Sequence, residues 1–170
     1  MHLNVQVLAL VGKPNSPPLC LSSNVVPNLF IYRSYLKMEL QIKIIGGLFI
    51  FLAFLHVFFP KYFNWKQELG SLSLMSRQMM YVHMFFIAFG IFLLGLLCLT
   101  SSDALLNTPF GKRVSLGLGI FWAVRLYVQF FVYSTKLWKG KAFETIVHIL
   151  FSLFWAYVSA IFLLGYLTSF

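Results

Sequence analysis

Charge is scarce in this 170-residue chain, and acidic charge is the scarcest kind. Charged residues make up 10% of the sequence, and only 4 residues are Asp or Glu. A typical soluble domain carries roughly 25% charged residues. Because 60% of the chain is hydrophobic, it lacks the polar surface that would have to cover an apolar interior in water. This composition excludes a soluble enzyme, a disordered chain and a coiled coil, and it predicts an integral membrane protein.

Cysteine is also scarce, and its spacing excludes two kinds of site. The chain has only Cys20 and Cys98, and without a CxxC pair neither a thiol redox centre nor a zinc ribbon is supported. No HExxH, CxxCH or histidine-box cluster occurs either. The formal charge of +9 would suggest nucleic acid in a soluble domain. Here the basic residues lie in short segments between apolar runs, as they do beside membrane spans, so we expect no nucleic-acid partner.

The first 37 residues differ from the rest of the chain. They contain four of the six prolines and no acidic residue, and their one apolar patch, residues 5–11, is too short to span a bilayer. From Met38 onward the sequence has the character of a membrane protein. Residues 1–37 are therefore interpreted either as an over-extended start, with translation beginning at Met38, or as a disordered N-terminal segment.

Residues 38–170 are predicted to form one all-α domain with four transmembrane helices. A lone strand cannot satisfy its backbone hydrogen bonds in lipid, so each apolar run is expected to be a helix. Because the connections are short, neighbouring helices should be antiparallel in a compact bundle. The predicted spans are residues 44–59, 79–99, 114–133 and 145–167.

A faint internal repeat groups the four spans into two tandem hairpins. The spacing from His56 to Trp65 equals that from Gln129 to Trp138, and a V-H-x-x-F-x-x-F pattern occurs from residues 82 and 147. Such a match is typical of parallel repeats in membrane proteins.

Basic residues predict the orientation of the bundle. The loops after the first and third spans contain six of them, Lys61, Lys66, Arg77, Lys136, Lys139 and Lys141. The opposite side carries three if the chain starts at Met38, namely Lys43, Lys112 and Arg113. The positive-inside rule then places the larger basic loops in the cytoplasm and both termini outside, in the cell (inner) membrane.

Polar side chains inside the spans are predicted to share one depth. His56, His83, Gln129 and His148 all lie roughly 6–10 Å from the surface next to the basic loops, at about 1.5 Å per residue. Arg125 lies one turn deeper and can bend toward this layer. Helical periodicity puts these residues on plausible inner faces. The four stripes are Gly46, Phe49, Ala53 and His56; His83, Gly90 and Leu94; Trp122, Arg125, Gln129 and Tyr133; and Glu144, His148, Ser152, Trp155 and Ser159.

Arg125 requires a partner, because a charged side chain at a helix centre costs about 2.5–3.5 kcal/mol on insertion scales. No span contains an acidic residue in its interior. Either Arg125 snorkels with water and locks the helices together, or it binds an anion from outside the chain. A haem propionate or a lipid phosphate would fit the guanidinium group.

The histidines also leave two interpretations open. Each can be a hydrogen-bonded packing residue, as a single intramembrane histidine usually is. Alternatively, His56, His83 and His148 bind a transition metal such as Cu, Zn or Fe, or two of them ligate a haem iron with Arg125 near a propionate. The candidate cofactor-binding set is therefore His56, His83, His148, Arg125 and Gln129.

Three functions are compatible with these features. The first is a haem- or metal-binding component of the membrane, and the second is a structural or assembly subunit of a membrane complex. The third is a small transporter. Proton-coupled exporters of this size depend on an acidic residue in the first span, and the first span of this chain has none. The expected partners are the lipid bilayer and either another membrane protein or a second copy of the chain.

Overall fold

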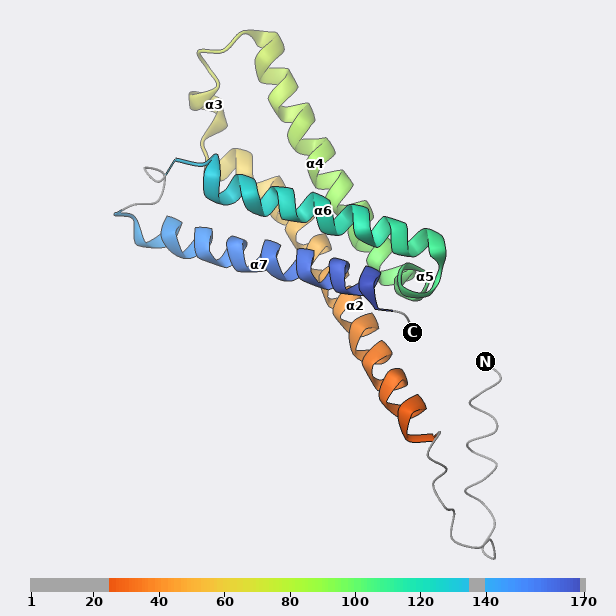
Figure 1. Ribbon diagram of the computed structural model, residues 1–170. Helices are drawn as coiled ribbons and strands as arrows, with labels where there is room; N and C mark the ends of the chain where they lie inside the picture. The colour runs from red at the N-terminus through yellow and green to blue at the C-terminus, as the bar shows by residue number, and fades with distance from the viewer. Residues whose placement is uncertain (1–24, 135–139, 169–170) are drawn as a thin grey trace, which may run out of the picture. The chain divides into compact units, whose positions relative to one another are not determined.

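The computed structural model describes residues 25–134 and 140–168, with side chains from Tyr32 onward (Figure 1). Within these residues the elements are helices only. The chain divides into residues 1–34 and a compact unit of residues 35–170, and the packing below is that of the second unit.

Six helices make up the described part of the chain. Four are long and apolar enough to cross a membrane, with candidate spans at Tyr32–Tyr62, Leu74–Thr100, Pro109–Phe131 and Ala142–Leu167. The protein is therefore an all-α, multi-pass integral membrane protein with a four-helix bundle. The helices are α2 (Val25–Tyr62), α3 (Trp65–Glu68), α4 (Leu74–Thr100), α5 (Ser102–Asn107), α6 (Pro109–Phe131) and α7 (Ala142–Leu167).

The helix ends extend beyond the predicted spans. Pro60 was expected to close the first span, but α2 continues through it to Tyr62. The third span was predicted from residue 114, whereas α6 begins at Pro109. Thr108 caps α6 by accepting the backbone N–H of Gly111 through its hydroxyl, and proline suits the first helical position.

The segment before Met38 is only partly described. The prediction for residues 1–37 falls largely on residues 1–24, which lie outside the described residues. From Val25 onward the chain is helical and continuous with the first span. Tyr35 and Met38 pack against the hydrophobic core. The choice of Met38 as the start remains a prediction.

Helices α6 and α7 lie side by side and antiparallel (Figure 1). Gly119 of α6 accepts a hydrogen bond from the Ser159 hydroxyl of α7 at 3.0 Å. Further along α6, Trp122 stacks on Trp155. Since contact positions rise along α6 as they fall along α7, the two helices run in opposite directions, as the short connection predicts.

Helix α2 is antiparallel to both α4 and α7. A Cβ built on Gly46 would lie 2.9 Å from the carbonyl oxygen of Gly95, so the α2 and α4 backbones approach closely. Two turns on, Phe54 of α2 meets Phe92 of α4 at a centroid distance of 6.4 Å. On the α7 side, the Tyr157 hydroxyl donates to Gln41, and further along α2 Phe49 meets Phe154 at a centroid distance of 6.1 Å. The bundle therefore alternates in direction from α2 to α7.

The short helix α5 joins α4 to α6 and packs against α6. A Cβ on Gly111 would lie 1.9 Å from the carbonyl oxygen of Ala104, a separation that only glycine allows. The buried Ser115 hydroxyl donates to the carbonyl of Leu105 at 3.2 Å. No helix was predicted between the second and third spans, and the structure has one there that packs against the start of α6.

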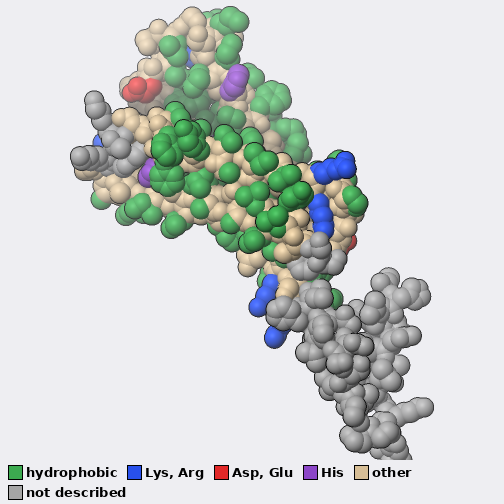
Figure 2. Space-filling model, in the orientation of Figure 1, with side chains coloured by type: hydrophobic (Ala, Val, Ile, Leu, Met, Phe, Trp, Pro, Cys, Tyr) green, Lys and Arg blue, Asp and Glu red, His purple; other side chains and the backbone are tan. Residues whose placement is uncertain are grey.

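The bundle buries its aromatic and aliphatic residues unevenly. Phe49 of α2 and Phe162 of α7 are fully buried, whereas all side chains from Leu74 to Phe89 in the first half of α4 are exposed or half-buried. Figure 2 shows hydrophobic side chains spread over the flanks of the helices on one face. Apolar flanks of this kind suit a lipid environment rather than water.

Candidate functional site

Three polar side chains form a continuous chain of hydrogen bonds between α6 and α7. Arg125 donates through Nη1 to Oε1 of Gln129 at 2.9 Å, one turn further along α6. Nε2 of Gln129 lies 2.9 Å from Nδ1 of His148 on α7. Gln129 is only 6% exposed. We call Arg125, Gln129 and His148 the polar layer, and all three belong to the predicted site.

The directions of these hydrogen bonds determine which ring nitrogen of His148 carries the proton. A guanidinium group can only donate, so Gln129 must present its oxygen to Arg125. Its amide nitrogen then donates to Nδ1 of His148, which acts as the acceptor. A neutral imidazole that accepts at Nδ1 carries its proton on Nε2.

Arg125 reaches toward the C-terminal end of α6 and contacts two aromatic rings. Its Cζ lies 5.6 Å from the Tyr133 ring centroid and 5.3 Å from that of Trp155. Cation–π contacts at these distances stabilise a guanidinium group without neutralising it. The bend of Arg125 toward the layer agrees with the sequence expectation.

No carboxylate in the described chain neutralises Arg125. All four acidic residues are described, and their ion pairs there are Lys43 with Glu39 and Lys141 with Glu144. Arg125 therefore holds a positive charge in a membrane span with one neutral hydrogen-bond acceptor and two rings. This arrangement can attract an anion.

Two stacked indoles adjoin the polar layer. The rings of Trp122 and Trp155 lie 4.6 Å apart and are parallel to within 3°. Both indole N–H groups are buried and, among the described residues, have no hydrogen-bond partner. A buried donor without an acceptor costs about 1–3 kcal/mol. The sequence placed both tryptophans on inner stripes but gave no sign of their unpaired donors.

The other two histidines bind their own helices. Nδ1 of His56 donates to the carbonyl of Leu52 at 2.7 Å, and Nδ1 of His83 donates to that of Met79 at 3.1 Å. Each neutral ring then has its lone pair on Nε2. His83 was expected on an inner face of the second span, but it is exposed.

The three histidines do not come together as the metal hypothesis requires. Among the described residues, which include all three, no group of three His, Cys, Asp or Glu side chains is placed to hold a metal ion. His148 also carries its proton on Nε2, so that nitrogen has no lone pair for a metal in this arrangement. A centre with all three ligands does not fit this arrangement. His56 and His83 retain the tautomer that an axial haem ligand needs.

Residues at matching positions of the internal repeat do not make matching hydrogen bonds. Gln129 and His148 occupy the positions that match His56 and His83, respectively. Gln129 bonds His148 across two helices, whereas the described bonds of His56 and His83 each go to a carbonyl of the same helix.

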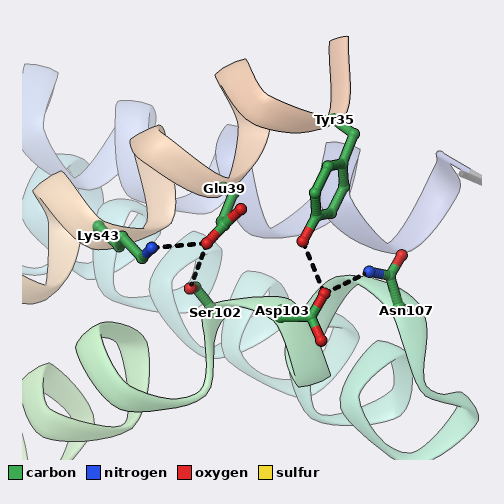
Figure 3. A network of polar contacts seen from close by, with 6 residues as sticks. All are labelled: Tyr35, Glu39, Lys43, Ser102, Asp103 and Asn107. Carbon is green, nitrogen blue, oxygen red and sulfur yellow. Dashed lines mark hydrogen bonds and ion pairs between the residues drawn. The ribbon is translucent and has the colours of Figure 1, made fainter. Parts of the chain in front are cut away.

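A second polar cluster, which the sequence analysis did not assign, joins α2 to α5 (Figure 3). Glu39 of α2 pairs with Lys43 at 2.6 Å and accepts the Ser102 hydroxyl at 3.4 Å. Tyr35 donates to Asp103 at 2.6 Å, and the Asn107 amide donates to the same oxygen at 2.7 Å. The i, i+4 spacing of Tyr35, Glu39 and Lys43 was the available signal.

The hydrogen bonds to Asp103 also affect its ionisation. Donation from the Tyr35 hydroxyl, followed in importance by donation from the Asn107 amide, holds the pKa of the Asp103 carboxyl below its usual value. The cluster therefore favours the ionised form of Asp103, which strengthens the link between α2 and α5 at neutral pH.

Comparison of the chain with protein-family models, curated proteins and solved structures gives no match. The polar layer is therefore the feature of this protein that points to a function.

Proposed function

We propose that this protein binds an anionic, amphipathic ligand within the membrane, with Arg125 as the residue that holds the ligand's charge. The main observation in support is that Arg125 lies in a membrane span and has no carboxylate partner among the described residues. Gln129 and the ring of Trp155 hold its guanidinium group at the interface of α6 and α7.

The cost of the charge supports this proposal. A central arginine costs about 2.5–3.5 kcal/mol on insertion, and an anion would offset much of that cost. The guanidinium group can donate two parallel hydrogen bonds to one carboxylate or phosphate. Gln129 uses Nη1 as a donor, and the remaining donors are sufficient for such a ligand.

Two ligands share this chemistry, a haem with its propionates and a phospholipid with its phosphate. If the ligand is haem, His56 or His83 would hold the iron through Nε2, and the haem would supply redox chemistry. If it is a phospholipid, no further ligand residues are needed. The proposed role is then that of a haem-binding or a lipid-binding membrane component.

Purification of the full chain in mild detergent tests the proposal. A Soret band in the absorbance spectrum identifies haem, and native mass spectrometry identifies a bound phospholipid. We expect one of the two, and we expect Arg125→Gln to remove it. The matched control is Arg113→Gln, because Arg113 is an exposed arginine at the start of the same helix. A folded Arg125→Gln protein that keeps its ligand would refute the proposal.

We also propose the orientation in which the larger basic loops face the cytoplasm and both termini lie outside, in the cell membrane. The six basic residues on that side, against three on the other from Met38 onward, support it. If Lys13, Arg33 and Lys37 also count, the two sides balance at six each. A C-terminal reporter that is active only in the cytoplasm should be silent, and an active reporter would reverse the orientation.

A second candidate function is that of a subunit in a membrane complex. It is supported by the first half of α4, where His83 is a polar, exposed side chain within a span. A polar group at such a position favours a protein partner over lipid. Cross-linking in native membranes from a cysteine at position 83 should give a discrete product with a partner or second copy. Products with no preferred size would contradict this role.

A further inference from the structure

The stacked pair Trp122 and Trp155 points to a second part of the binding site. Their side chains are 3% and 4% exposed, and neither indole N–H has a partner among the described residues. Ser159 and Ser152 donate their hydroxyl protons to Gly119 and His148, and neither hydroxyl oxygen accepts from an indole N–H. Two buried donors therefore remain available to an acceptor from outside the chain.

The stacking geometry restricts where that acceptor can lie. An indole N–H bond lies in the plane of its ring, and the two planes are parallel to within 3°. Both N–H groups therefore point out from the side of the stack rather than into it. On the α2 side, Phe49 covers Trp122 at a centroid distance of 4.9 Å. Arg125 lies over the Trp155 ring, with its Cζ 5.3 Å from the ring centroid.

We infer that Trp122 and Trp155 donate their indole N–H groups to the oxygens of the same anionic head that Arg125 binds. This inference rests on the proposed function and narrows its ligand. The head must be an oxyanion with two or more acceptor oxygens on one centre, as a phosphate or a carboxylate is. A cation and two neutral donors then surround it, without a carboxylate of the described chain to compete for them.

Nuclear magnetic resonance of the indole nitrogens tests the inference on the unmodified chain. The protein has four tryptophans, and single Trp→Phe variants assign their indole N–H signals. Delipidated protein in micelles of a phosphate-free, uncharged maltoside detergent is compared with protein in the same micelles supplemented with phosphatidylglycerol. Haemin and inorganic phosphate are the other two probes. We expect the Trp122 and Trp155 signals to move downfield with at least one probe, while the Trp65 signal stays in place.

The probe that moves the signals identifies the source of the oxyanion. Phosphatidylglycerol alone indicates a lipid phosphate, inorganic phosphate indicates a free anion, and haemin indicates a propionate. Signals from Trp122 and Trp155 that stay unmoved with every probe would overturn the inference. The proposed function would still hold in that case if Arg125→Gln abolished ligand binding, so the two failures are distinguishable.

Affinity measurements give a second test. Trp155→Phe keeps an aromatic ring in the stack and removes only the donor. Loss of one hydrogen bond to a charged group should weaken binding of the active probe by about tenfold or more. Trp65→Phe is the matched control, since Trp65 is a buried tryptophan of α3 that packs on Tyr81 of α4 and belongs to neither α6 nor α7. Equal affinities for the two variants would contradict the inference.

Discussion

Replacing Gln129 with glutamate would place an anion of the protein's own inside the polar layer. The two side chains have nearly the same shape, and Oε1 of Gln129 already lies 2.9 Å from Nη1 of Arg125. The new carboxylate would pair with Arg125 and accept a hydrogen bond from Nδ1 of His148, whose proton would move from Nε2 to Nδ1. We therefore expect Gln129→Glu to keep the fold, and we expect the new carboxylate to pair with Arg125 in place of the anionic ligand.

The size of the effect follows from the geometry around Arg125. An anion on the outer side of the guanidinium group would lie about 6 Å from the new carboxylate. At an effective dielectric constant of about 20, two like charges at about 6 Å repel by about 3 kcal/mol. This energy corresponds to binding that is weaker by about a hundredfold. Ligand that survives purification of the native protein should then be lost.

The assay compares ligand occupancy with stability in the same detergent. Native mass spectrometry and the absorbance spectrum report the ligand, and thermal unfolding reports the fold. Because a charge-assisted hydrogen bond is stronger than a neutral one, we expect the Tm to stay equal or rise while occupancy falls. Gln78→Glu, which adds the same charge on the exposed face of α4, should leave occupancy unchanged. A folded Gln129→Glu protein with full occupancy would refute the reasoning.

Three further predictions concern packing and pH. Gly46→Ala should lower the Tm, because its Cβ would lie 2.9 Å from the backbone of α4, whereas Gly47→Ala has open space and should not; equal Tm values would contradict the close contact. Gly111→Ala should destabilise by about 1–3 kcal/mol or more, because its Cβ would meet a backbone oxygen at 1.9 Å, and Gly117→Ala serves as its control in the same unfolding assay. The lowered pKa of Asp103 contributes stability above the pKa of the unfolded state, about 3.9, and this contribution disappears as the pH falls through the lower pKa of the folded state. Asp103→Asn should therefore reduce the Tm at pH 7 and converge with the native protein in acid; a gap that persists in acid would refute the assignment.

The four spans could be predicted from the sequence, but their exact ends could not. Hydrophobicity adds up along a run of residues, so an apolar run of this length can be recognised as a span without knowing which helices pack against it. The ends depend on local caps such as Thr108 before Pro109, and on contacts such as that of Tyr35 with Asp103. Helix α5 was missed because it is short and is held in place by its packing on α6.

Helical periodicity predicted much of the polar layer. It placed Gln129 and Trp122 on one stripe and His148 and Trp155 on another, and these stripes do face each other. It also placed His83 on an inner stripe, where the prediction was wrong because the first half of α4 is exposed. A stripe marks which face of a helix is polar or small, but it does not determine which helix covers that face.

The sequence by itself determined that the protein resides in a membrane and that it is helical with four spans. It also determined that the charge of Arg125 costs free energy inside its span. These properties follow from the transfer energies of residues, which depend on the solvent and not on the partner. Only the tertiary structure decided that Arg125, Gln129 and His148 form one chain of hydrogen bonds while His56 and His83 stay apart. A hydrogen bond requires two atoms within about 3 Å, and a small rotation or shift of a helix breaks it. The close contact of α6 with α7 at Gly119 and Ser159 sets that alignment.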